Sequence, residues 1–185
     1  MTMKLVGDNS ARQLSQRRRH GFTIVELLVV IVIIGILAAI TVVAYGNIQQ
    51  RSRDAVRLQD ARTIEKALVL YRAQTGTLFG PTSVDGSWET SFEDGPGDFM
   101  ETLVSSSTLS KVPIDPQNTG ARHYRYYLYP AGTSGCDTTR GTFAVLQIID
   151  LETSPRPYAG NPGFSCSGRD WSTEADYTFG MYLNG

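Results

Sequence analysis

The feature that most constrains this chain is a run of apolar residues near its N-terminus. No charged residue lies between Leu27 and Gln50, and residues 27–40 are apolar apart from Gly35. The 23 residues from Phe22 to Ala44 exceed the roughly 20 that a helix needs to cross the hydrocarbon core of a bilayer. We therefore predict a membrane-spanning helix over residues 22–44.

One acidic residue, Glu26, lies inside this apolar run. An ionised carboxylate in hydrocarbon costs roughly 2.5–3.5 kcal/mol on insertion scales, so such residues usually have a partner and a function. A secretory signal cleaved before Tyr45 and an uncleaved signal anchor are both compatible with the apolar run. Neither of these interpretations explains Glu26.

Charge is unevenly distributed along a chain whose net charge is only −1. Residues 1–21 carry five basic residues and one acidic residue, residues 51–74 carry six basic and three acidic ones, and residues 75–185 carry six basic and thirteen acidic ones. By the positive-inside rule, the basic N-terminal residues predict that the N-terminus lies in the cytoplasm and the C-terminal part outside. Three arginines just beyond the apolar run, Arg51, Arg53 and Arg57, weaken this prediction without reversing it.

The helix is predicted to continue beyond the membrane to Thr75. Its apolar residues recur at steps of three or four, the period of an amphipathic helix: Leu58, Ala61, Ile64, Leu68 and Tyr71. No proline occurs in residues 1–80, and Gly76 is a natural stop. One helix over residues 22–75 would be roughly 80 Å long at 1.5 Å per residue. Its second half needs an apolar surface to pack against.

That surface is predicted to come from a globular head over residues 76–185. Residues 76–120 are rich in Gly, Pro, Ser, Thr and Asp, which indicates a long loop, with one short helix near Phe99–Val104. Residues 121–185 contain three candidate strands, at Tyr124–Tyr129, Phe143–Leu151 and Asp176–Leu183. We expect an antiparallel sheet of three to four strands with one apolar face, packed on the helix in an α+β fold.

The two cysteines, Cys136 and Cys166, lie in the connections on either side of the middle strand. If the head is exported, a disulfide between them is expected, because oxidising compartments favour the bond. Two reduced thiols would require a cytosolic head and a different interpretation of the apolar run.

The residues around the start of the apolar run resemble those of type IV pilins and of their relatives, the pseudopilins and competence pilins. The matching residues are the basic run Arg17–Arg19, the hexapeptide Gly21–Glu26 and the apolar stretch from Leu27. Weaker similarities are Val112–Pro116 and the aromatic strand that follows it. The resemblance implies the type IV pilin fold, in which a long N-terminal helix packs on a small sheet.

The resemblance also implies how the chain is processed. A prepilin peptidase would remove the leader, residues 1–21, by cutting after Gly21, and would N-methylate the new terminal residue, Phe22. Glu26 lies one helical turn from the new ammonium, so it can neutralise its own amine or that of a staggered neighbour. Subunits joined by a rotation and rise that do not close would form a helical filament.

The implied partners are other pilin subunits, the prepilin peptidase, the pilus assembly platform and, before assembly, the cytoplasmic membrane. After assembly the chain would lie in an extracellular pilus, as a major or minor subunit. Alternatives within the family are a pseudopilin of a type II secretion system and a competence pilin. The Trp-Gly that commonly follows Asp-Pro in major pseudopilins is absent after Asp115–Pro116, and the helix-kinking proline of many members is replaced by Val43. Outside the family, a signal-anchored extracellular binding domain remains an alternative.

No residues form a pattern typical of an enzyme, a metal site or a cofactor site, so we expect none of these. His20 belongs to the leader and His123 stands alone. The predicted loop contains four acidic residues, Asp85, Glu93, Asp94 and Asp98. Their spacing is not that of a calcium-binding loop. By resemblance to pseudopilins, a calcium ion at Asp170, Glu174 and Asp176 is a weak alternative.

Nucleic acid or a surface is a conceivable partner that the charge does not favour. Residues 75–185, with thirteen acidic and six basic residues, would repel phosphate unless their charge is patchy. Binding to DNA would have to use arginines of the head, namely Arg122, Arg125, Arg140 or Arg156.

Overall fold

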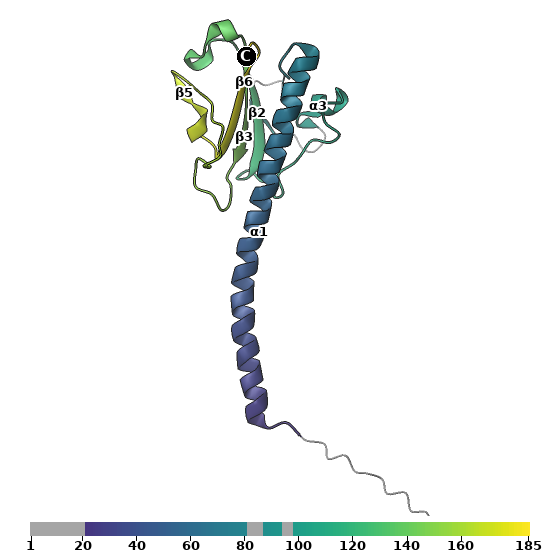
Figure 1. The fold of residues 1–185 in the computed structure, drawn as a ribbon, viewed down its shortest axis with the longest axis vertical. Coiled ribbons are helices and arrows are strands. Elements are labelled where there is room, and N and C mark those ends of the chain that lie inside the picture. The colour runs from purple at the N-terminus through teal and green to yellow at the C-terminus, as the bar shows by residue number, and fades with distance from the viewer. Residues whose placement is uncertain (1–20, 81–86, 94–97) are drawn as a thin grey trace, which may run out of the picture. The chain divides into compact units, whose positions relative to one another are not determined.

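A computed structural model describes residues 21–80, 87–93 and 98–185, and the chain divides into two units between Val43 and Ala44. The long helix α1 spans Ile24–Thr75, 52 residues, close to the predicted 22–75 (Figure 1). It ends where Gly76, at a φ of 69°, donates its amide to the carbonyl of Arg72. Glycine is the favoured residue in this left-handed position after a helix, which explains why α1 stops there.

The head contains a four-stranded antiparallel sheet in the order β1-β2-β3-β6. Its strands are β1 (Glu89–Thr90), β2 (His123–Tyr129), β3 (Phe143–Ile149) and β6 (Tyr177–Tyr182). The three predicted strands are confirmed as β2, β3 and β6. The short β1 was not predicted, because it lies in the segment expected to be a loop and pairs with β2 through only two residues.

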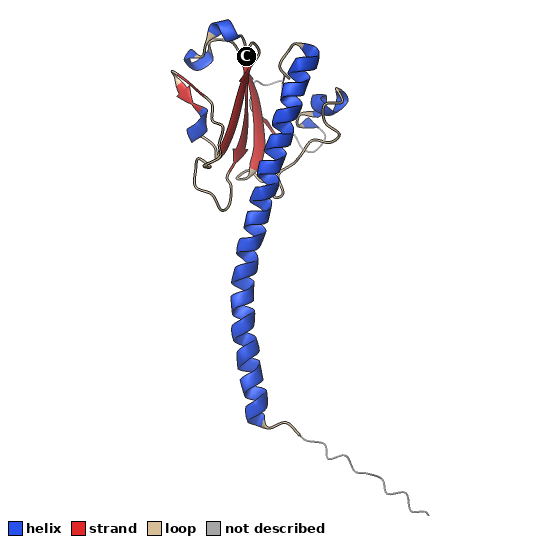
Figure 2. Cartoon of the chain, in the orientation of Figure 1, coloured by secondary structure: helices blue, strands red, loops and turns tan. Residues whose placement is uncertain are grey.

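Smaller elements complete the head (Figure 2). The predicted short helix is α3 (Glu101–Ser105). A two-stranded ribbon joins β4 (Ser165–Cys166) to β5 (Arg169–Asp170). The 3₁₀ turns among the described residues are η1 (Thr133–Gly135), η2 (Thr138–Arg140) and η3 (Trp171–Thr173). Cys136, just after η1, is joined to Cys166 of β4 by the expected disulfide.

The second half of α1 packs against one face of the sheet. Its predicted apolar stripe is confirmed: Ala61, Ile64 and Leu68 are buried, and the half-buried Leu58 and Tyr71 pack against the same core. The sheet contributes alternate residues to this core, including Tyr124 and Tyr126 of β2. The residues that alternate along the strand and those that recur at the helical period in α1 thus form one core.

The opposite face of the sheet is also covered by apolar side chains, so the expectation of a single apolar face is wrong. Trp171 of η3 is fully buried against Phe143 and Tyr129, with ring centroids 5.5 Å and 5.2 Å apart. Strand β3 is buried on both faces, which explains why it is almost continuously apolar rather than alternating. The C-terminal segment that carries Cys166 forms this second layer.

Candidate functional site

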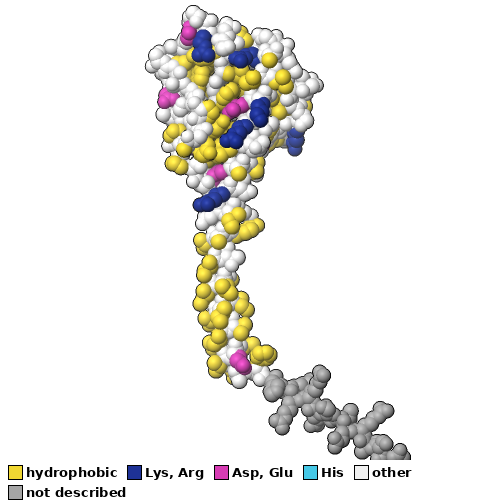
Figure 3. Space-filling model, viewed as in Figure 1, with side chains coloured by type: hydrophobic (Ala, Val, Ile, Leu, Met, Phe, Trp, Pro, Cys, Tyr) yellow, Lys and Arg dark blue, Asp and Glu magenta, His cyan; other side chains and the backbone are white. Residues whose placement is uncertain are grey.

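The N-terminal half of α1 presents apolar side chains that nothing in the described chain covers. Every residue from Phe22 to Val43 is exposed. Figure 3 shows hydrophobic side chains along this part of the helix, with one acidic group near its start. Among the described residues, α1 is the helix whose length and composition allow it to cross a membrane. Of the predicted span 22–44, all residues from Ile24 on thus lie on a helix that is long and apolar enough to cross a membrane.

Glu26 and Thr23 form a reciprocal pair of hydrogen bonds at the start of α1. The carboxylate oxygen Oε2 of Glu26 accepts from the Thr23 amide at 2.8 Å and from the Thr23 hydroxyl at 2.8 Å. The Thr23 hydroxyl in turn accepts from the Glu26 amide at 3.2 Å. This is a capping box, which satisfies backbone donors that the first turn of a helix leaves unpaired.

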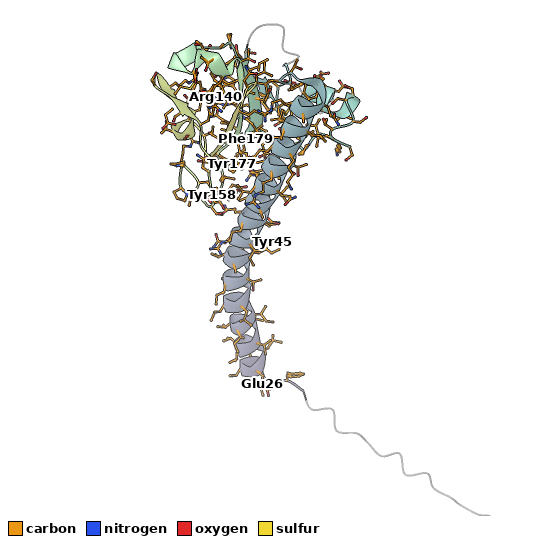
Figure 4. All side chains as sticks on the ribbon, turned by 45° about the horizontal axis from the view of Figure 1, so that its top comes forward. Glu26, Tyr45, Arg140, Tyr158, Tyr177 and Phe179 are labelled. Atoms are coloured by element: carbon orange, nitrogen blue, oxygen red, sulfur yellow. A yellow bond between two sulfur atoms is a disulfide. The ribbon has the colours of Figure 1, made fainter. Side chains whose placement is uncertain are left out.

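The capping box gives Glu26 a partner within its own chain, which sequence analysis did not identify. The spacing Thr-x-x-Glu before an apolar run is the sequence pattern typical of a capping box, so the sequence alone indicates it. Figure 4 shows Glu26 at the beginning of the helix, and Phe22 precedes the box with its side chain exposed. The basic run Arg17–Arg19, His20 and the rest of the leader before Gly21 lie outside the described residues.

A cluster of charged side chains, buried in the head, joins α1 to two loops. We call Asp54, Arg57, Asp115 and Glu152 the Arg57 cluster. The Arg57 side chain is fully buried, and its guanidinium donates to Asp115 at 2.7 Å, to Asp54 at 2.9 Å and to Glu152 at 2.8 Å. Arg53 adds a bond to Glu152 at 2.6 Å. Helix α1 is thereby joined to the end of the 76–120 loop and to the segment after β3.

Further hydrogen bonds satisfy the carboxylates of this cluster. Asp54 accepts from the amides of Glu152 and Thr153 at 2.9 Å and 2.8 Å, and Asp115 accepts from the Gln117 amide at 2.8 Å. Hydrogen bonds from Arg53 lower the pKa of Glu152 to about 2; burial opposes this shift and Arg57 reinforces it. Two of the three arginines just beyond the apolar run, Arg53 and Arg57, are therefore neutralised by carboxylates of the head.

The Arg57 cluster predicts that the head loses stability in acid. Because the pKa of Glu152 falls from 4.5 when unfolded to about 2 when folded, its ionised form stabilises the fold above pH 4.5 and ceases to do so as the pH falls toward 2. Urea unfolding of the full chain in detergent, followed by tryptophan fluorescence between pH 7 and pH 2, measures this loss. Glu152→Gln should be less stable at pH 7 and lose less stability over the acid range.

Two other carboxylates act in the opposite direction and serve as an internal comparison. Burial raises the pKa of Asp60 and of Glu65, although bonds from Tyr124 and Tyr177 oppose the shift. Their contribution to stability is greatest below their unfolded pKa and declines as the pH rises. An equal acid loss in wild type and Glu152→Gln would show that Glu152 is not responsible.

The three acidic residues considered for a calcium ion each make contacts within the head. Asp170 caps η3, Glu174 pairs with Arg169 at 2.6 Å, and Asp176 pairs with Arg156 at 2.9 Å. Across residues 21–80, 87–93 and 98–185, no group of three His, Cys, Asp or Glu residues is arranged to hold a metal ion. Asp85 and Asp94 lie outside these ranges.

The four arginines considered for nucleic-acid binding are each engaged by the head. Arg122 pairs with Asp150 at 2.9 Å, and Arg156 pairs with Asp176. The guanidinium carbons of the other two lie over aromatic rings, Arg125 at 4.2 Å from the centre of Trp88 and Arg140 at 3.8 Å from that of Tyr182. Nothing in this arrangement adds to the weak expectation of DNA binding.

Comparison with known proteins agrees with these features. Residues 16–42 match the family described as "Prokaryotic N-terminal methylation motif". The chain is 40% identical over 154 residues to the type II secretion system core protein G of Pectobacterium carotovorum subsp. carotovorum, which covers 82% of this chain and 86% of that protein. The chain belongs to the type IV pilin and pseudopilin family. This membership replaces the interpretation as an unrelated anchored binding domain.

Other members of the pilin and pseudopilin family are also similar to this chain. It is 29% identical over 123 residues to the type II secretion system core protein G of Pseudomonas aeruginosa, covering 66% of this chain and 81% of that protein. It is 34% identical over 100 residues to the type IV major fimbrial protein FimA of Dichelobacter nodosus, covering 53% and 60%. No solved structure matches.

Proposed function

We propose that this chain is a prepilin, cut between Gly21 and Phe22, whose mature form is a structural subunit of a type IV filament. Members of this family are structural proteins rather than enzymes. The observation that carries the proposal is the N-terminal half of α1, whose uncovered apolar surface carries a single acidic residue, Glu26, four residues from the new terminus. An apolar helix of this kind suits both a membrane and the core of a filament.

Processing would turn the capping box into a site for a second charge. Cutting after Gly21 creates an ammonium at Phe22, which must also enter an apolar environment when subunits leave the membrane. In the described structure, hydrogen bonds reach only Oε2 of Glu26, so Oε1 can accept one from an ammonium while Thr23 holds the carboxylate. If that ammonium belongs to a neighbouring subunit, pairing offsets the cost of burying two charges and fixes the register of assembly.

The proposed location before assembly is the cytoplasmic membrane, with the head outside. The Cys136–Cys166 disulfide supports an exported head, because such bonds persist in oxidising compartments. The prepilin peptidase would act on the cytoplasmic side, where it would also methylate Phe22. The assembly platform would then transfer subunits into a filament that extends from the cell.

A second candidate is a pseudopilin of a type II secretion system. The similarity to two proteins named core protein G favours it, whereas the missing Trp-Gly after Asp115–Pro116 does not. Both candidates use the same N-terminal chemistry. They differ in the length of the filament and in whether secretion of other proteins depends on it.

Shearing of the cell surface tests the proposed function. We expect the chain in sheared filaments recovered by sedimentation, and not in the same fraction from cells that lack its gene. If secretion of other proteins fails in those cells while surface filaments are absent from the wild type, the pseudopilin assignment holds instead. Recovery of the chain only as a membrane monomer, with secretion unaffected, would contradict both assignments.

A further inference from the structure

An apolar groove lies beside α1 at the β6 edge of the sheet. It has a volume of about 370 Å³ and is lined by Glu65, Lys66, Val69, Leu70, Ala73 and Phe179. Val69 is 44% exposed and Leu70 is 45% exposed, although both lie on the half of α1 that packs on the head. Figure 4 shows Phe179 and Tyr177 on the strand next to this part of α1. The head therefore leaves one apolar strip of its own helix uncovered.

The head also presents a partly exposed aromatic ring, that of Phe92. Phe92, 46% exposed, lies in the turn that follows β1, and Glu93 beside it is exposed. Among the described residues after Val56, the large hydrophobic side chains that are exposed are Val69, Leu70 and Phe92. Among the described residues after Val56, these exposed side chains thus lie at two places, the groove and the Phe92 turn, which we define as Phe92 and Glu93.

We propose that the groove of one subunit holds the Phe92 turn of a second copy of this chain, which rests on the proposed function as a filament subunit. The volume of the groove, about 370 Å³, lies within the range of clefts that bind drug-sized molecules, so it can accept a phenylalanine side chain. Lys66 lines the groove, is exposed and forms no ion pair within the part of the chain that the structure describes, whereas the charge of Arg62, one turn away, already acts on Glu65. Lys66 therefore complements Glu93 in charge, because Glu65 at the same groove is engaged by Arg62 and accepts a hydrogen bond from Tyr177 at 2.5 Å.

The order of the sheet makes this contact heterologous. Phe92 follows β1, which forms one edge of the sheet, and Phe179 belongs to β6 at the other edge in the order β1-β2-β3-β6. A surface at one edge that binds a different surface at the other edge of the next subunit is heterologous. Such contacts generate open helical assemblies when the rotation does not close a ring. The head would therefore add a directional contact to that made by the N-terminal helices.

Cysteine cross-linking in sheared filaments tests this contact, because the described head has no free cysteine. The double variant Ala73→Cys with Glu93→Cys should form a ladder of disulfide-linked multimers under mild oxidation, while each single variant should not. The control, Gln59→Cys with Glu93→Cys, places the helix cysteine about 21 Å away along α1 and should give no ladder. Filaments that form normally without the Ala73–Glu93 ladder would overturn the contact while leaving the proposed function intact.

A charge exchange provides the second readout. Lys66→Glu alone should lower the yield of sheared filaments by about tenfold through repulsion of Glu93, and adding Glu93→Lys should restore most of it. If the exchange does not restore the yield, the assignment of the Phe92 turn as the occupant is overturned. It is also overturned if the cysteine of Ala73→Cys cross-links to a different protein or to the same cysteine of a second copy. If the wild type gives no sheared filament and cells that lack the gene secrete other proteins normally, the proposed function fails, and this contact fails with it.

Discussion

Replacing Glu26 by alanine should abolish filament assembly while leaving the folded head unchanged. The substitution removes both the helix cap and the negative charge near the processed terminus. An ammonium at Phe22 would then have to be buried without a partner, and breaking a buried ion pair costs about 3–5 kcal/mol. At 1.4 kcal/mol per factor of ten, each subunit contact would weaken by more than about 100-fold. The yield of sheared filaments, compared with the amount of processed chain in membranes, measures the effect.

Glu26→Gln separates the two roles of this residue. Glutamine can also complete a capping box with Thr23, because its side-chain oxygen accepts the same hydrogen bonds. The variant should therefore keep the start of α1 but still fail to assemble, since its side chain carries no charge. Wild-type assembly of Glu26→Gln would contradict the ion-pairing mechanism and leave capping as the role of the residue.

Arg57→Met should cause the largest loss of stability in the head. Methionine fills much of the same space but leaves Asp54, Asp115 and Glu152 without the guanidinium that joins them. Loss of one partner from a buried ion pair typically costs about 3–5 kcal/mol. Urea unfolding of the full chain in detergent at pH 7 measures the difference in the free energy of unfolding.

Arg51→Met is the matched control for this experiment, because Arg51 is exposed on the same helix. Substitutions at such surface positions usually change stability by no more than about 0.5 kcal/mol. Arg57→Lys should fall between the two, since lysine lacks the planar fork that contacts several carboxylates at once. A loss for Arg57→Met as small as that of the control would show that the cluster contributes little to stability.

The regular parts of the fold were predictable because they depend on local periodicity. The spacing of Ala61, Ile64 and Leu68 identified the buried stripe of α1, and alternation in β2 identified the face that packs on it. The apolar run and the hexapeptide at Gly21–Glu26 identified the family. Gly76 correctly marked the end of the helix. In each case a short stretch of sequence carries the whole signal.

Most of the features that the sequence did not predict depend on contacts between residues that are distant along the chain. The burial of Arg57 was not predicted, because arginine is rarely fully buried and its contact with Asp115 spans 58 positions. The second core formed around Trp171 because the C-terminal segment folds back over the sheet, which no periodicity encodes. The Thr23–Glu26 box, in contrast, has a local signal that could have been recognised.

Mass spectrometry of the N-terminal peptide from the mature chain tests the central claim most directly. Cleavage after Gly21 and methylation predict a peptide that begins with Phe22 and carries one additional methyl group on its amine. A terminus at Tyr45 would show an ordinary secretory signal, and an intact Met1 would show an uncleaved anchor. Either of these results would contradict the account, because no ammonium would then lie within one helical turn of Glu26.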